Sequence, residues 1–231
     1  MKLLKIKNLY VRLILQIITL LFIFASVCIA ASDDIKRIKK ELNNSDWQIR
    51  LKAVENLSAI RNEDAVDLLI EVAGQRGEKW PVKKKAILTL GETKDPKAIE
   101  ILLSIFKDMT INWDCPAIKS YTAIALGNFK GYPSVVDALI NGTTDSELLT
   151  REASIRSLGK IGDSRAVPHI INLLSDKSAA IKLSAIKALE EIGDDRAISK
   201  LQYLAENDND PLIKKEVNDA LKNFRKHKEY Q

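Results

Sequence analysis

The sequence has few of the residues from which enzymes build reactive centres. Its 231 residues include only two histidines, and neither is followed by glutamate. A di-iron centre held on helices needs several such His-Glu pairs to supply imidazole and carboxylate ligands. No glycine-rich loop of the kind that cradles phosphate occurs either. We therefore expect neither a catalytic residue, a metal nor a cofactor.

Cysteine and aromatic residues are also scarce. The two cysteines are Cys28, in an N-terminal apolar run, and Cys115. A single remaining thiol excludes an intrachain disulfide framework and a Cys-rich zinc site. Cys115 is expected to pack as a small apolar side chain, the alternative being a thiol free to pair between chains. Aromatics make up 6% of the chain, and abundant alanine, leucine and isoleucine favour helices over strands.

The N-terminus is typical of an export signal. Residues 1–12 carry four positive charges, an apolar run covers 13–31, and Cys28 and Ala30 suit a cleavage site. We expect residues 1–30 to be a signal peptide and 31–231 the folded domain. An uncleaved membrane anchor and a lipoprotein signal modified at Cys28 remain open. In each case the positive end stays inside, which predicts a periplasmic or extracellular domain.

The formal charge of +5 arises mainly from this N-terminal segment. The chain has 36 basic and 31 acidic residues, and four of the basic ones precede residue 13, so 32 face 31 in the remainder. Nucleic-acid binding needs a basic excess on the folded domain. The balance argues against a nucleic-acid partner.

Six segments of the remaining chain share one pattern. Each has a leucine, here called the anchor leucine, at intervals of 31 to 36 residues: Leu57, Leu90, Leu126, Leu158, Leu189 and Leu221. Seven residues earlier stands a basic residue, and these six form the basic ladder: Arg50, Lys83, Lys119, Arg151, Lys182 and Lys214. Small and apolar residues at helical spacing between the two positions predict a buried helical stripe in each segment.

Residues typical of helix ends lie between the segments and indicate paired helices. Helix N-cap candidates follow four anchors by five residues: Asn62, Asp95, Asp163 and Asp194. Gly162 and Gly193 suit left-handed C-caps. Glycines directly after three anchors predict close helix packing: Gly91, Gly127 and Gly159. A shorter apolar helix follows each turn, and an opening helix over about Asp34 to Leu42 completes six pairs.

Two stretches of the sequence resemble a known family. LGKIGDSRAVPHIINLL (158–174) and LEEIGDDRAISKLQYL (189–204) resemble HEAT-like repeats of the phycobilisome-lyase type. The resemblance covers residues 33–225 and implies an all-α fold, a right-handed α-solenoid of about six HEAT-like helix pairs with the second helices on its inner face. Because such a solenoid here lacks a catalytic set of residues, we interpret it as a non-catalytic protein-protein interaction scaffold acting outside the cytoplasm. The alternative is an enzyme or lyase-type chaperone subunit resembling bilin lyases, which act in the cytoplasm.

Candidate contact residues are aromatic or basic. The aromatic candidates are Trp47, Trp80, Trp113 and Tyr121. The loop Lys107 to Cys115 breaks the repeat most and is a candidate contact site. The basic ladder has two interpretations: a row of cations facing a partner, or pairs with Asn62, Asp95, Asp163 or Asp194 in the preceding turn that tie units together. We expect another protein as the partner, and membrane contact only through an uncleaved leader.

Overall fold

The computed structural model describes residues 33–60, 62–108, 115 and 117–229, together with Gln16 and Thr19. Every regular element among them is a helix, and no strand occurs in these ranges. The predicted signal peptide or anchor, residues 1–30, lies almost entirely outside the described residues. No helix in the described part of the chain is both long and apolar enough to cross a membrane.

The helices form six antiparallel pairs, as the repeat predicts. The first helices of the pairs are residues 33–42, α3 (Glu63–Gly74), α5 (Ala98–Lys107), α7 (Pro133–Gly142), α9 (Val167–Leu173) and α11 (Ile198–Asn207). The second helices are α2 (Trp47–Leu57), α4 (Trp80–Thr93), α6 (Ile118–Leu126), α8 (Leu148–Ile161), α10 (Ala179–Ile192) and α12 (Pro211–Glu229). Short 3-10 turns, η2 (Ser164–Ala166) and η3 (Asp195–Ala197), precede α9 and α11.

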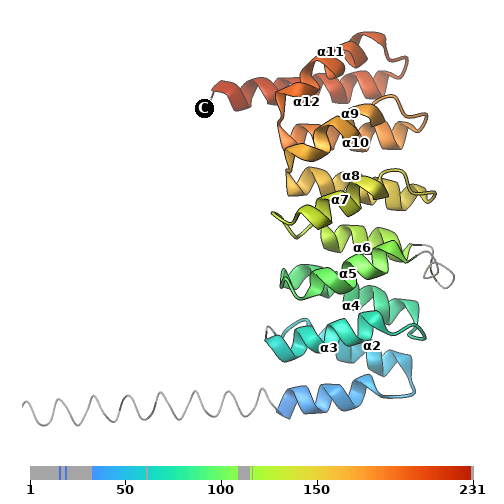
Figure 1. The fold of residues 1–231 in the computed structure, drawn as a ribbon, viewed down its shortest axis with the longest axis vertical. Coiled ribbons are helices and arrows are strands. Elements are labelled where there is room, and N and C mark those ends of the chain that lie inside the picture. Colours follow the sequence, from blue (N-terminus) through green and yellow to red (C-terminus); the bar gives the residue numbers. More distant parts are fainter. Residues whose placement is uncertain are drawn as a thin grey trace, which may run out of the picture.

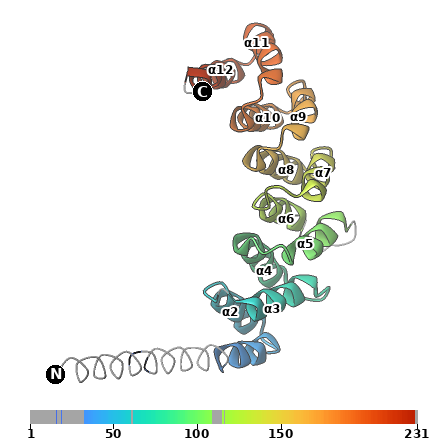
Figure 2. The same ribbon diagram turned by 60° about the vertical axis from the view of Figure 1, so that its left-hand side comes forward.

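The pairs stack into a curved column of two layers (Figure 1). Each second helix packs on the second helices of the neighbouring pairs, from α2 to α12, and the first helices form the other layer. Figure 2 shows the column bending so that the second helices line its concave side. The predicted α-solenoid with second helices on the inner face is confirmed for the described residues.

The anchor leucines form the seam between the layers. Leu57, Leu90, Leu126, Leu158 and Leu189 are fully buried. Full burial of such a side chain is worth about 1.5–3 kcal/mol, so these positions hold the two layers together. The sixth anchor, Leu221, is only partly buried because no seventh pair covers α12. There the core is closed by Ile213, Val217 and Phe224.

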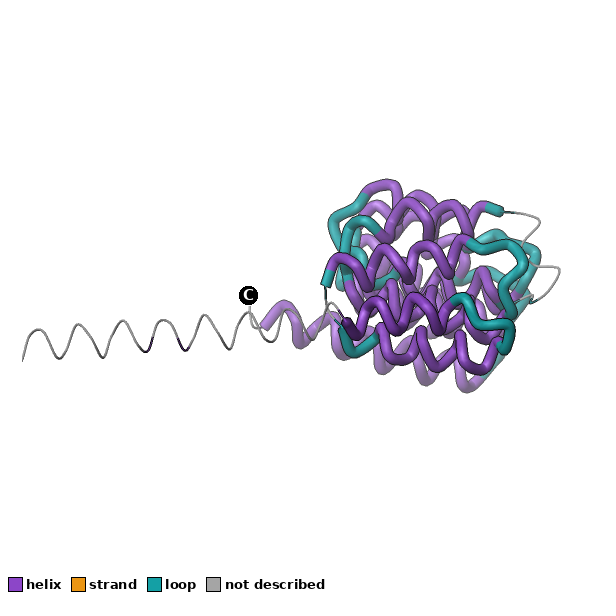
Figure 3. Tube along the Cα trace, turned by 90° about the horizontal axis from the view of Figure 1, so that it is seen from below, coloured by secondary structure: helices purple, strands orange, loops and turns teal. Residues whose placement is uncertain are grey.

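Connections lie at two opposite edges of the column, as the view along the stack shows (Figure 3). We call the edge formed by the loops inside the pairs the loop edge, and the edge formed by the turns between pairs the turn edge. At the turn edge Asn62, Asp95, Asp163 and Asp194 accept backbone N–H bonds of the following helix at 2.9–3.0 Å, as predicted for caps.

Glycine serves the two purposes that the sequence predicts. Gly162 and Gly193 end α8 and α10 with φ of 79° and 73°, a backbone conformation that residues other than glycine rarely adopt. Gly127 has no room for a Cβ, which would stand 2.6 Å from the hydroxyl oxygen of Ser157 in the next second helix. Close approach of the second helices therefore depends on glycine at this position.

Candidate binding surface

The basic ladder lies at the loop edge, where each second helix begins. The guanidinium of Arg50 in α2 donates to both carboxylate oxygens of Glu78, at 2.8 and 2.7 Å, and to the carbonyl of Asn44 at 2.7 Å. Glu78 belongs to the loop of the next pair, and its side chain is 2% exposed. Bonding to Glu78 raises the pKa of Arg50 above its ordinary value. This pair ties the first two repeats together.

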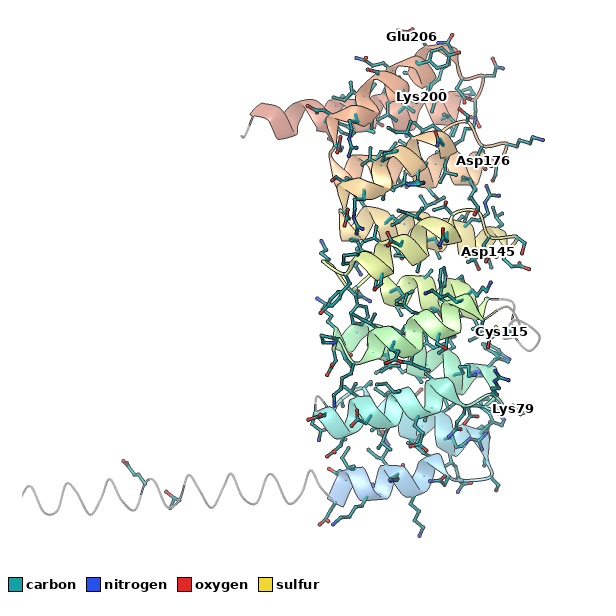
Figure 4. The ribbon with its side chains drawn as sticks, in the orientation of Figure 1. Lys79, Cys115, Asp145, Asp176, Lys200 and Glu206 are labelled. Atoms are coloured by element: carbon teal, nitrogen blue, oxygen red, sulfur yellow. The ribbon has the colours of Figure 1, made fainter. Side chains whose placement is uncertain are left out.

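The same contact recurs along the column. The remaining paired ladder residues each reach an aspartate in the loop of the next pair: Lys119 to Asp145 at 3.0 Å, Arg151 to Asp176, and Lys182 to Asp208 at 2.6 Å. Each aspartate also accepts a backbone N–H two residues further on, at 2.8–3.0 Å. Figure 4 shows Asp145 and Asp176 on this edge. The carboxylates therefore fix their own loop and bind the preceding repeat.

The predicted partners of the ladder were wrong, although the prediction of structural ion pairs is confirmed for four of the six residues. Asn62, Asp95, Asp163 and Asp194 lie at the turn edge. A helix of 14 residues spans about 21 Å, so a cation at its start cannot reach a cap that follows its end. The acid that completes the pair comes instead from the next loop. Most of the ladder is therefore built into the stack rather than offered to a partner.

The other two ladder residues have different surroundings. Lys214 in α12 donates to the carbonyl of Glu206, in the last turn of α11 of its own pair, at 2.9 Å. Lys83 in α4 is 3% exposed. The loop of the next pair, where the pattern places a partner for Lys83, includes residues 109–114, which lie outside the described residues.

The aromatic candidates do not form one surface. Trp47 is partly buried against the core, and Trp80 is 46% exposed where α4 begins at the loop edge. Trp113 lies outside the described residues, with most of the loop Lys107 to Cys115. Tyr121 in α6 lies under the ammonium of Lys84, 4.5 Å from the ring centroid. Of the described candidates, Tyr121 alone belongs to the concave side.

The concave side carries an apolar patch that the sequence reasoning missed. Because the anchor leucines point at the first helices, residues two, five and nine positions earlier lie on the opposite, concave side of each helix. The concave patch consists of Leu88, Tyr121, Ile124 and Leu149, and Ile124 and Leu149 are 40% and 58% exposed. The sequence did carry a signal for this patch. Two residues before the anchor stand the apolar Leu88 and Ile124 in two repeats, whereas the other four repeats have a charged residue there: Glu55, Arg156, Lys187 and Asp219.

Cations without partners surround this patch. Lys85, Arg156 and Lys187 also lie on the concave side, five or two positions before an anchor, and none makes a hydrogen bond or ion pair within the described part of the chain. Their amines and guanidinium are thus available to a ligand. The concave side therefore presents exposed apolar surface with unpaired cations in its middle repeats, while the first and last repeats carry the acidic Glu55 and Asp219 there.

Two clefts open at the turn edge, with opposite charge. The acidic cleft, about 480 Å³, lies between the first two repeats and is lined by Glu63, Glu92 and Asp95, with Lys97 bonded to Glu63 across it. The basic cleft, about 360 Å³, lies between the third and fourth repeats and is lined by three lysines. These are Lys94, Lys130 and Lys160.

Side chains with reactive potential are dispersed. Within the described ranges no three His, Cys, Asp or Glu side chains converge on a common metal position. His169 is exposed on α9. Cys115 is a free thiol that is partly buried and packs against the core.

Comparison with family models explains the pattern of these contacts. The model for HEAT repeats matches residues 35–110, 108–178 and 163–222, which together span nearly the whole described column. The chain belongs to the HEAT-repeat family. In this HEAT-repeat protein the anchors, caps and loop-edge ion pairs recur along the stack, whereas a functional role must be argued from its individual residues. Comparison with curated proteins gives no significant match.

Solved structures confirm the fold of this HEAT-repeat protein. A designed armadillo repeat protein in complex with the peptide (KR)4 matches with a TM-score of 0.57 and 14% identity over 81% of this chain and 98% of that one. The CpcE–CpcF complex of phycocyanin lyase from Nostoc sp. PCC7120 matches with 0.56 and 20%, over 79% and 74%. An engineered protein matches with 0.55 and 19%, over 84% and 97%. At these identities the likeness is one of fold.

Proposed function

We propose that this HEAT-repeat protein is a non-catalytic scaffold that binds another protein on its concave side, outside the cytoplasm. The observation that carries the proposal is the concave patch, where Ile124 and Leu149 are exposed and Leu88 and Tyr121 are half-buried. Exposed apolar groups gathered on one face of a folded domain are typical of interaction sites.

The arrangement suits a segment that crosses several repeats. Leu88, Tyr121 and Leu149 come from three successive second helices, so one ligand chain laid along the column contacts all of them. Tyr121 supplies a large, rigid contact surface at low entropic cost, and Lys84 already holds its ring from one side. The likeness to a designed armadillo repeat protein in complex with a peptide supports this use of the fold.

Site-specific photo-crosslinking tests the proposal. A photoreactive phenylalanine analogue at Ile124, on the concave side, is compared with one at Ser104, exposed on the first-helix layer in α5. In the producing cell the analogue at position 124 is expected to give a discrete crosslinked protein that is absent at position 104. Equal crosslinking from both positions, or crosslinking from position 104 alone, overturns the proposal.

The location outside the cytoplasm rests on the N-terminal sequence. Four positive charges, an apolar run and small residues near Ala30 favour export of everything that follows. Cell fractionation with N-terminal sequencing of the isolated protein tests this. We expect periplasmic or membrane-tethered protein, with a mature end near residue 31 if the segment is cleaved.

The same fractionation distinguishes the scaffold from the enzymatic alternative. A lyase-type subunit resembling bilin lyases works in the cytoplasm, so recovery of the intact chain from the cytosol favours that function and removes the basis for an external scaffold. The likeness to phycocyanin lyase concerns the fold and does not choose between them.

A further inference from the structure

The basic cleft gathers positive charge from three repeats at one point. Lys94 comes from the turn after α4, Lys130 from the turn after α6, and Lys160 from the last turn of α8. No carboxylate belongs to its described lining, whose other polar side chains include Asn128, which accepts from Lys160 at 2.7 Å. The comparable acidic cleft holds its lysine in ion pairs, so the missing countercharge here is a local feature.

Lys94 occupies a backbone conformation that the other turns give to glycine. Its φ is 55°, and it is the one non-glycine residue with positive φ among the described residues. The turns after α6, α8 and α10 use Gly131, Gly162 and Gly193 for this conformation. A side chain retained against a backbone preference points to a use for that side chain. Lys94 is one of the residues that line the cleft.

The basic cleft continues the concave side. Lys160 follows its anchor leucine by two residues within α8, which places it on the same side of that helix as Arg156, and it bonds Asn128 in the turn after α6. Tyr132 adds an aromatic ring to the cleft lining and packs edge-on against the buried Phe129, with ring centroids 6.4 Å apart. A ligand leaving the concave patch towards the turn edge therefore enters a pocket with cationic and aromatic walls.

We infer that the basic cleft binds the carboxylates of an acidic peptide segment whose apolar side chains rest on the concave patch. This inference rests on the proposed function and specifies its ligand. Three ammonium groups without a countercharge attract a cluster of Asp and Glu side chains or a C-terminal carboxylate. Next to it, Tyr121 and Ile124 accept apolar side chains.

A peptide fits the observations better than a nucleic acid. Backbone phosphates are bound by a long stripe of cations, whereas the charge here is confined to a cleft of about 360 Å³. The acidic cleft lies on the same turn edge and repels a polyanion that extends along the column. The apolar patch beside the lysines suits side chains rather than phosphates.

Selection from a random dodecapeptide library tests the inference. The full-length protein is immobilised, the library is selected by display, and the affinity of the enriched peptides is measured by fluorescence anisotropy. We expect Asp and Glu to be enriched beside apolar residues. The K94Q/K130Q/K160Q variant is expected to weaken binding by about tenfold or more, and duplex DNA is expected not to compete.

A matched variant controls for net charge. K39Q/K40Q/K177Q removes three exposed lysines away from the cleft and is expected to change the affinity by less than about twofold. Enriched peptides without acidic residues, equal weakening in both variants, or displacement by DNA overturn the inference. If such non-acidic peptides still lose binding in I124D, the proposed function stands without it. If no peptide is enriched, both fail.

Discussion

The Cα atom of Ala125 lies 2.6 Å from the position that a Cβ on Gly91 would occupy. These residues belong to α4 and α6, so the second helices of neighbouring repeats meet backbone to backbone. A Cβ methyl group introduced at position 91 meets a main-chain atom, so no flexible side chain can move aside to make room for it. Glycine at this position sets the spacing of the column.

Gly91→Ala is therefore expected to destabilise the protein by about 1–3 kcal/mol through overpacking. The free energy of unfolding from urea denaturation, followed by circular dichroism, measures the change. Gly77→Ala is the matched control, because a Cβ there meets nothing within 4 Å; its effect is expected to stay within about 0.5 kcal/mol. Equal stability of the two variants contradicts the close packing.

Gly91 also shows what the sequence alone can predict. The spacing of anchors, caps and glycines reflects contacts that recur in every repeat, so one pattern predicted the helix pairs, the buried leucines and the close approach. The partners of the basic ladder were not predictable in this way, because spacing does not show at which end of a helix a neighbour's acid lies. The sequence places Asp163 and Asp176 equally plausibly near Arg151.

The concave residues were missed for a different reason. Leu88 and Ile124 read as ordinary members of an apolar helix, and their exposure depends on the curvature and stacking of six second helices. Trp47 and Trp80 attracted attention as large aromatics, yet one is partly buried and the other lies at the loop edge. A contact surface formed by departures from a repeat is identified only when the faces of the repeat are known.

The buried loop-edge pair between Arg50 and Glu78 is expected to stabilise the N-terminal repeats. Glu78→Ala leaves the Arg50 guanidinium, 17% exposed, without its bidentate acceptor. We expect a loss of about 2–4 kcal/mol in thermal or urea unfolding, because a mostly buried charge loses its partner. Glu55→Ala removes the exposed partner of Lys52 in the same helix and is expected to cost less than about 1 kcal/mol.

Asp208 makes part of the stability depend on pH. The ammonium of Lys182 and the N–H of Asp210 lower the pKa of Asp208 below its ordinary value. The stabilising effect is thus complete above about pH 3.9, the unfolded value, and is lost as pH falls through the lower native pKa. Asp208→Asn is expected to cost about 1 kcal/mol at pH 7 and little in strong acid.

Urea unfolding over a pH series checks this expectation for Asp208→Asn. Asp219→Asn is the control: its pKa is also lowered, by Lys222, but the pair is exposed, so solvent screens it and little change is expected. A deficit for Asp208→Asn that persists undiminished below the native pKa contradicts an origin in the carboxylate charge.

Lys94 is expected to lower the stability of the fold while it strengthens peptide binding. A non-glycine residue in the left-handed conformation costs about 1–2 kcal/mol, and glycine loses about 0.5–1 kcal/mol through the entropy of the unfolded chain. Lys94→Gly is therefore expected to raise the free energy of unfolding by about 0.5–1 kcal/mol while weakening peptide binding. Lys94→Ala removes the same charge but keeps the strained backbone, so it weakens binding without the gain in stability.

The most direct test of the account compares Ile124→Asp with the wild type in binding the partner recovered by crosslinking, measured by isothermal titration calorimetry. The side chain at position 124 is 40% exposed, so the substitution leaves the core intact and the melting temperature is expected to change little. A concave binding site predicts a rise in dissociation constant of about tenfold or more, since a carboxylate replaces an apolar contact. An unchanged dissociation constant with the fold intact contradicts it.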